Sequence, residues 1–308
     1  MPSVSVVGSG NVGANTAFFI AESSPVDVLL CDVKEGMSTG KSLDMMEAAP
    51  LRRYRGKLTG ADSIDAIRDS AVVIVAAGSI RAPGKKREEL YAENSPLISQ
   101  LAPQIARLAP KSVVIVATEP VDLMTMLFVR ESKLPRTRVL GLGGMLDAQR
   151  FRTTIARALS LSSENITATV VGPHTDAMMF LPQFTRVGGV PLAQLMSEAE
   201  IEKAISAAKG RGDEILRLAA RSTSYYAPGA CAAELVDAIT ADLRRVVSLS
   251  VVLDGEYGIK GVSLSLPVVL GRQGALKVLQ PKLTPDQAKS LAASAEALRA
   301  IAKSGGKN

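Results

Sequence analysis

The sequence predicts an α/β fold with a doubly wound parallel sheet in its first half, followed by an α+β unit. Up to about residue 145, short runs of Val, Ile and Ala alternate with longer segments of helical period, as in βαβ units. Later, residues 248–252 and 258–269 alternate apolar and polar side chains, which is typical of antiparallel strands. A chain of 308 residues is long enough for two domains, and we place them at 1–145 and 146–308.

The expected elements of the first unit follow from its apolar runs. Near-continuous apolar sequence indicates strands buried on both faces, as a parallel sheet requires. These strands are expected at 4–7, 26–31, 71–77, 112–117 and 139–142, with helices at 14–22, 40–49, 88–108 and 121–131 between them.

The second unit is expected to contain a helix at 147–159, a strand at 166–171, helices at 198–221 and 228–246, and then the antiparallel strands. The last helix has clear end signals. Thr284 is suited to the N-cap, Pro285 to the first turn and Gln287 to the reciprocal capping position, while the glycines at 305–306 end the helix. Its apolar residues share one face, so we expect this helix to dock.

Composition excludes several classes of protein. Lys and Arg total 36 against 30 Asp and Glu, a net charge of +6, but these charges are dispersed, which favours a small anionic ligand over nucleic acid. With no Trp, six Phe and five Tyr, few aromatic platforms could stack on bases. We therefore expect no nucleic-acid partner.

We also expect a cytoplasmic chain that binds no membrane and no metal. No apolar run approaches the ~20 residues that span a bilayer, and Met1-Pro2 leads directly into the first expected strand without a basic leader. Cys31 and Cys231 are too few for a disulfide framework and have no zinc-type spacing, so they are expected to be packed thiols.

A glycine-rich turn predicts a nucleotide site. Residues 8–13 (GSGNVG) follow the first expected strand and open a helix. Gly8 permits the tight turn, Gly10 the approach of a pyrophosphate and Gly13 close packing of the helix, whose N-terminal N–H groups attract the anion. Asp32, at the end of the second strand, is placed to accept from a ribose 2′-hydroxyl and would repel a 2′-phosphate, which favours NAD over NADP. The alternative is a glycine turn in an α/β protein that binds no nucleotide.

His174 is the single histidine and lies in a loop after an expected strand. Oxidation of an alcohol needs a proton acceptor near neutral pH, and no other histidine can supply it. Asp147 and Arg150 begin a helix one turn apart. The alternatives are a packed histidine and a surface ion pair between residues three apart.

The connection at 78–88 follows the strand that ends near Ala77 and contains Arg81 and Arg87. Loops at the carboxyl ends of strands bind ligands in open α/β sheets and can act as lids. The two arginines could bind carboxylates there. The alternative is that these are solvated charges at the start of a helix.

These motifs together resemble the lactate/malate dehydrogenase family, and within it the malate dehydrogenases that are similar to lactate dehydrogenase. The similarity extends from residues 8–13 through 254–259 (DGEYGI) to the last helix. It implies a Rossmann domain and an α+β catalytic domain. It also implies an NAD-dependent oxidation of (S)-malate to oxaloacetate, a reaction of the tricarboxylic acid cycle, in a homodimer or homotetramer.

The resemblance also implies roles for individual residues. His174 matches the acid/base that moves the alcohol proton, Asp147 the carboxylate that orients it, and Arg87 the loop arginine that polarises the carbonyl. Arg150 matches the residue that holds the C1 carboxylate. Arg81 matches the position at which malate dehydrogenases have an arginine that pairs with the second carboxylate. Lactate dehydrogenases commonly have Gln at this position. Ser224 lies near a substrate-pocket position, and the cofactor-binding set comprises Gly8, Gly10, Asn11, Val12, Gly13, Asp32, Ala77, Gly78, Asn94, Ala117 and Glu119.

The sequence departs from the family at two places. Residues 118–122 read TEPVD where the family has TNPVD, so Glu119 replaces an asparagine that donates to the substrate oxygen. An ionised glutamate has no donor and would repel a dianion. Either Glu119 is protonated, or it turns onto Arg81, Arg87 or Arg150, or turnover is impaired. Pro173 and Thr175 also replace the glycines that usually flank the histidine.

Two other functions are therefore open at this point. One is a lactate or other 2-hydroxy acid dehydrogenase, against which Arg81 argues. The other is a protein that binds NAD or a dicarboxylate, with catalysis impaired by Glu119.

Overall fold

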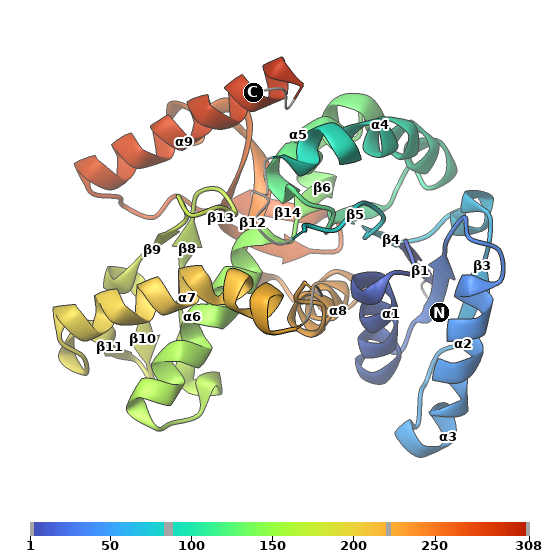
Figure 1. The fold of residues 1–308 in the computed structure, drawn as a ribbon, viewed down its shortest axis with the longest axis horizontal. Helices are drawn as coiled ribbons and strands as arrows, with labels where there is room; N and C mark the ends of the chain where they lie inside the picture. The colour runs from blue at the N-terminus through green and yellow to red at the C-terminus, as the bar shows by residue number, and fades with distance from the viewer. Residues whose placement is uncertain (1–2, 83–88, 220–222, 306–308) are drawn as a thin grey trace.

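A computed structural model of the chain describes residues 3–82, 89–219 and 223–305. Within these residues a nine-stranded sheet has the order β14-β13-β12-β6-β5-β4-β1-β2-β3. Helices cover both of its sides, and a smaller lobe built around α6 and α7 projects from it (Figure 1).

The six parallel strands are formed by the first half of the chain. β4 and β5 are runs of Val and Ile in which every residue is buried. The strand order reverses between β1 and β4, which is where open α/β sheets bind their ligands. The strands are β1 (Ser3–Val7), β2 (Asp27–Cys31), β3 (Leu58–Ala61), β4 (Val72–Val75), β5 (Val113–Val116) and β6 (Val139–Gly141).

The helices of this half connect successive strands. They are α1 (Asn11–Ser23), α2 (Met37–Glu47), α3 (Ala49–Arg52), α4 (Leu90–Leu108) and α5 (Val121–Ser132). Short 3₁₀ turns lie along the whole chain at Ile64–Ile67, Arg136–Arg138, Ser163–Asn165, Pro182–Phe184, Leu192–Gln194 and Glu256–Gly258.

The second half extends the same sheet. Its antiparallel strands β12 (Arg245–Asp254), β13 (Lys260–Gly271) and β14 (Gly274–Val278) join the parallel strands where Ser250 of β12 pairs with Gly141 of β6. The helices are α6 (Gly143–Leu159), α7 (Glu198–Leu218), α8 (Tyr226–Thr240) and α9 (Pro285–Ser304).

The main apolar core draws on both halves of the chain. It contains Val4 and Ile74 of the parallel strands together with Leu235 of α8 and Leu291 of α9. A division at residue 145 would therefore separate segments that share one core.

The smaller lobe has its own apolar cluster, in which Phe151 of α6 packs on Phe180 with ring centroids 4.9 Å apart. Its strands are β7 (Ile166–Thr167), β8 (Val170–Val171), β9 (Met179–Phe180), β10 (Arg186–Val187) and β11 (Val190–Pro191).

The predicted fold class is confirmed, but some predicted elements have different bounds. The helix expected at 228–246 ends at Thr240, because Asp242 and Arg244 take positive φ angles of 52° and 53° and the chain turns into β12. The strand expected at 166–171 divides into β7 and β8, which pair with different partners. The edge strand β3 was missed because its LTGA sequence lacks an apolar run.

The capping predicted for α9 is confirmed. Thr284 accepts from the backbone N–H of Gln287, whose side chain accepts from Thr284 in return, and Gly305 ends the helix at φ 66°. Among the described residues, no helix combines the length and apolarity needed to cross a membrane.

Candidate functional site

The glycine turn after β1 forms a closely packed cradle. Gly8 has φ 101°, and a Cβ atom there would lie 2.5 Å from the backbone N of Ala77. A Cβ atom on Gly13 would lie 1.8 Å from the carbonyl oxygen of Gly8, so only glycine fits at both positions. At Gly10 no atom lies within 4 Å of a Cβ position, and no described side chain caps the first turn of α1. The space beside Gly10, at the start of α1, is therefore open to an approaching pyrophosphate.

Asp32 lies beside this turn, at the end of β2. Its Oδ2 accepts from the backbone N–H and the hydroxyl of Ser9, at 2.7 and 2.9 Å, and its Oδ1 accepts from the N–H of Lys34 at 3.1 Å. Burial by itself would raise the pKa of Asp32, but these hydrogen bonds outweigh it and the pKa is lowered. The carboxylate is therefore ionised, which suits a ribose hydroxyl and disfavours a phosphate.

The ends of β4 and β5 are held together by Asn94 of α4, which is buried. Its amide oxygen accepts from the N–H of Ser79 at 2.7 Å, and its amide nitrogen donates to the carbonyl oxygen of Glu119 at 2.7 Å. Gly78 lies in the same place, where a Cβ atom would approach the Thr118 methyl to 2.7 Å. Asn94 thus fixes the two strand ends that border the crevice beside the predicted positions 77, 78 and 117.

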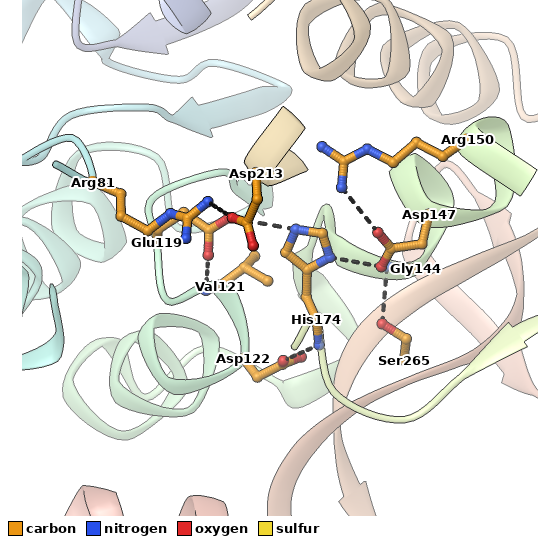
Figure 2. Close-up of polar contacts among 10 residues, drawn as sticks. All are labelled: Arg81, Glu119, Val121, Asp122, Gly144, Asp147, Arg150, His174, Asp213 and Ser265. Carbon is orange, nitrogen blue, oxygen red and sulfur yellow. Dashed lines mark hydrogen bonds and ion pairs between the residues drawn. The ribbon is translucent and has the colours of Figure 1, made fainter. Parts of the chain in front are cut away.

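His174 follows β8 and is almost fully buried. Its Nδ1 lies 2.6 Å from Oδ2 of Asp147 on α6, which is 1% exposed (Figure 2). A buried carboxylate on Nδ1 fixes the orientation of the ring. The opposite nitrogen, Nε2, faces the pocket that His174 lines.

The backbone of His174 is held by a second buried acid, Asp122 in the first turn of α5. Its Oδ2 accepts from the N–H of His174 at 2.6 Å, and its Oδ1 accepts from the hydroxyl of Ser250. Burial raises the pKa of Asp122 to about 6, although these hydrogen bonds lower it in part. No role was assigned to Asp122 from the sequence. The local signal that could have found it is a single acid among the apolar residues at the start of a helix.

Arg150 is also buried, and its Nη1 lies 3.4 Å from Oδ1 of Asp147. This excludes the alternative of a solvated surface pair between Asp147 and Arg150. Arg150 lines the same pocket as His174, and it contacts Oδ1 of Asp147 whereas the imidazole contacts Oδ2 (Figure 2).

Glu119 makes a contact that we did not consider from the sequence. Its Oε1 lies 3.4 Å from Nε2 of His174, and its Oε2 accepts from the N–H of Val121 at 3.3 Å. The side chain is 32% exposed. Carboxylates therefore lie on both nitrogens of the imidazole, Asp147 on one and Glu119 on the other (Figure 2).

Arg81 lies across the pocket from Arg150 and pairs with Asp213 of α7. Nothing in the local sequence indicated this contact, because 132 residues separate the two. Arg87, the predicted loop arginine, lies outside the described residues. Ser224 lines the pocket, which encloses about 130 Å³.

The structure therefore brings predicted substrate-binding and cofactor-binding residues to one crevice. Arg81, Glu119, Arg150, His174 and Ser224 line it, as do Val12 of the glycine turn and Gly78 and Ala117 after the ends of β4 and β5. In the part of the chain that is described, no group of three or more His, Cys, Asp or Glu side chains is suited to a metal ion.

Comparison with known proteins shows the family. Residues 3–141 match the family domain described as "lactate/malate dehydrogenase, NAD binding domain", and residues 144–308 match the "lactate/malate dehydrogenase, alpha/beta C-terminal domain". The chain belongs to the lactate/malate dehydrogenase family. The resemblance inferred from the motifs, and the NAD-binding first half, are thereby confirmed.

Relatives and solved structures in this family agree over the full chain. A malate dehydrogenase from Methanosarcina mazei is 38% identical over 299 residues, which is 97% of each chain. The crystal structure of the Cryptosporidium parvum malate dehydrogenase superposes with a TM-score of 0.96 at 29% identity, over 98% of both chains. The lactate dehydrogenase of the same organism, complexed with lactic acid and the dinucleotide, has a TM-score of 0.95 at 30% identity over 100% of this chain and 98% of its own.

Proposed function

We propose that this chain is an NAD-dependent malate dehydrogenase, which interconverts (S)-malate and oxaloacetate. One observation carries the proposal: two arginines, Arg81 and Arg150, line the same pocket as His174, whose Nδ1 is held by the buried Asp147. A guanidinium on each side of the acid/base provides a partner for each carboxylate of a dicarboxylate substrate.

The residues around the glycine turn fit the dinucleotide. Gly8, Gly10 and Gly13 and the N–H groups of α1 would hold the pyrophosphate, and Asp32 the ribose hydroxyls. Held there, NAD would supply the acceptor for the hydride of malate C2.

The chain's own groups supply the proton transfer. Nε2 of His174 accepts the proton of the C2 hydroxyl, and the imidazolium that forms is stabilised by Asp147 on Nδ1. Asp122 accepts a hydrogen bond from the backbone N–H of His174, which helps to hold the ring towards the pocket. Arg150 binds the C1 carboxylate and Arg81 the second one. We assign polarisation of the carbonyl to Arg87 from the resemblance alone.

We also propose, from the resemblance, that the chain forms a homodimer or homotetramer in the cytoplasm and acts in the tricarboxylic acid cycle. Leu43 of α2 and Leu51 of α3 are 64% and 85% exposed, which supports association through these helices. Analytical ultracentrifugation would give the number of subunits.

The function is tested by supplying oxaloacetate and pyruvate side by side and following loss of NADH absorbance. A strong preference for oxaloacetate is expected. Preference for pyruvate would identify a lactate-type enzyme instead. NADH binding without turnover of either substrate would identify the chain as a protein that binds NAD without catalysis. Glu119 would then be the first candidate for the cause of the lost turnover.

A further inference from the structure

In this structure Arg81 already has a carboxylate partner within the protein. Nη2 of Arg81 pairs with Oδ1 of Asp213. Arg81 follows β4 in the first half of the chain, whereas Asp213 lies on α7 next to Gly212, which lines the pocket. The contact therefore joins the two sides of the substrate crevice (Figure 2).

The two partners differ in their surroundings. The Arg81 side chain is only 15% exposed, whereas that of Asp213 is 66% exposed. A largely buried guanidinium needs a counter-ion, because little water is left to solvate it. An exposed carboxylate is hydrated when the pair breaks, so it can be exchanged readily for another anion.

We propose that Asp213 is a specificity-determining residue, whose carboxylate takes the place on Arg81 that the second carboxylate of a dicarboxylate substrate must occupy. The inference rests on the proposed function and extends it. Oxaloacetate must displace Asp213, because two carboxylates beside one guanidinium, with Glu119 also lining the pocket, would repel each other. Pyruvate has no second carboxylate and leaves the pair intact. Asp213 therefore weakens binding of dicarboxylates and keeps Arg81 neutralised when a monocarboxylate binds.

The test is Asp213→Asn, which keeps the size of the side chain and removes its charge. KM for oxaloacetate is expected to fall at least threefold with kcat little changed, because the Asp213 carboxylate no longer competes for Arg81. kcat/KM for pyruvate is expected to fall at least threefold, because Arg81 loses the Asp213 carboxylate in that complex. The preference for oxaloacetate over pyruvate should thus rise about tenfold.

Two controls separate this effect from others. Glu214→Gln removes the neighbouring charge on α7, which pairs with Arg211 and does not line the pocket, and it should leave the preference unchanged. In an Arg81→Gln background, Asp213→Asn should have no further effect, because the group for which Asp213 competes is gone.

Three results would overturn the proposal. The first is a higher KM for oxaloacetate in Asp213→Asn, which would show that Asp213 orients Arg81 for the substrate. The second is an unchanged preference, and the third is an equal change in Glu214→Gln. Failure of the proposed function is distinct, because it appears as an inactive wild type. In that case, calorimetry would measure the affinity of the NADH complex for a dicarboxylate, hydroxymalonate, and for a monocarboxylate, lactate. The ratio of the first affinity to the second must rise in Asp213→Asn.

Discussion

Replacement of Glu119 by Gln tests the most unusual feature of the site. The variant keeps the length of the side chain, removes its charge and restores an amide donor. The substrate oxygen that exchanges a proton with His174 must lie about 2.8 Å from Nε2. Glu119 Oε1 already lies 3.4 Å from the same nitrogen. The glutamate and the substrate oxygen would therefore be within about 6 Å of each other, as the sum of these two distances shows.

The C2 oxygen itself is uncharged, but the substrate carboxylates next to it carry unit charges. A carboxylate about 5 Å from an ionised Glu119 would be repelled by about 3.3 kcal/mol at an effective dielectric constant of about 20. The glutamate can avoid a larger penalty by taking up a proton, which at pH 7 costs an ordinary Glu, of pKa about 4.3, about 3.7 kcal/mol. Because Glu119 is 32% exposed, water reduces the effect. We therefore expect Glu119→Gln to raise kcat/KM for oxaloacetate about tenfold to a hundredfold at neutral pH.

The assay is steady-state reduction of oxaloacetate and oxidation of malate across the pH range, with Glu119→Asn, the residue of the family motif, as a second variant. An unchanged or lower kcat/KM for oxaloacetate in both variants would refute the repulsion argument. It would mean that the site is adapted to the acid and that the Glu119 contact with His174 contributes to turnover.

Three further predictions concern Arg81, Asp32 and Asp122. Arg81→Gln should reduce kcat/KM for oxaloacetate about tenfold to a hundredfold, since one charge-assisted pair is worth ~1.5 to 3 kcal/mol. The reduction for pyruvate should be much smaller. Equal losses on both substrates would show that Arg81 does not select between them. Asp32→Asn keeps an acceptor for Ser9 and removes the negative charge. The ratio of activity with NADPH to activity with NADH should therefore rise about tenfold. An unchanged ratio would contradict the repulsion assigned to Asp32. Burial raises the pKa of Asp122 from 3.8 to about 6, so the folded state favours its neutral form. The free energy of unfolding should therefore fall by up to about 3 kcal/mol as the pH rises from about 4 to above 6, and urea denaturation of Asp122→Asn should show a flatter curve over this range.

Much of the fold was predictable because its signals are local. β4 and β5 were found from their apolar runs, since a strand buried on both faces has almost no polar residue. The glycine turn was found because it requires glycine locally: Gly8 has φ 101°, and a Cβ atom on Gly13 would meet the carbonyl oxygen of Gly8. The capping residues of α9 satisfy backbone groups of their own helix, and therefore they could be read directly.

Other features are not encoded in any local pattern. Alternation predicted the strands β12 and β13 but could not show that they continue the parallel sheet through the pair of Ser250 and Gly141. The end of α8 was misplaced because the apolar content of residues 228–246 suits both a helix and a strand. The turn at Asp242 and Arg244 decides between them through its backbone conformation.

By itself the sequence determined which residue types are available: one histidine, a glycine turn with an acid after the second strand, and arginines at two positions of a possible pocket. Only the tertiary structure decided their partners. His174 lies 27 residues from Asp147 and 52 from Asp122, and Arg81 lies 132 from Asp213. Periodicity reports whether an element buries a face, but not what that face meets. Side chains from distant elements become neighbours only through the packing of the whole core, and that packing turned Glu119 onto His174 and Asp213 onto Arg81.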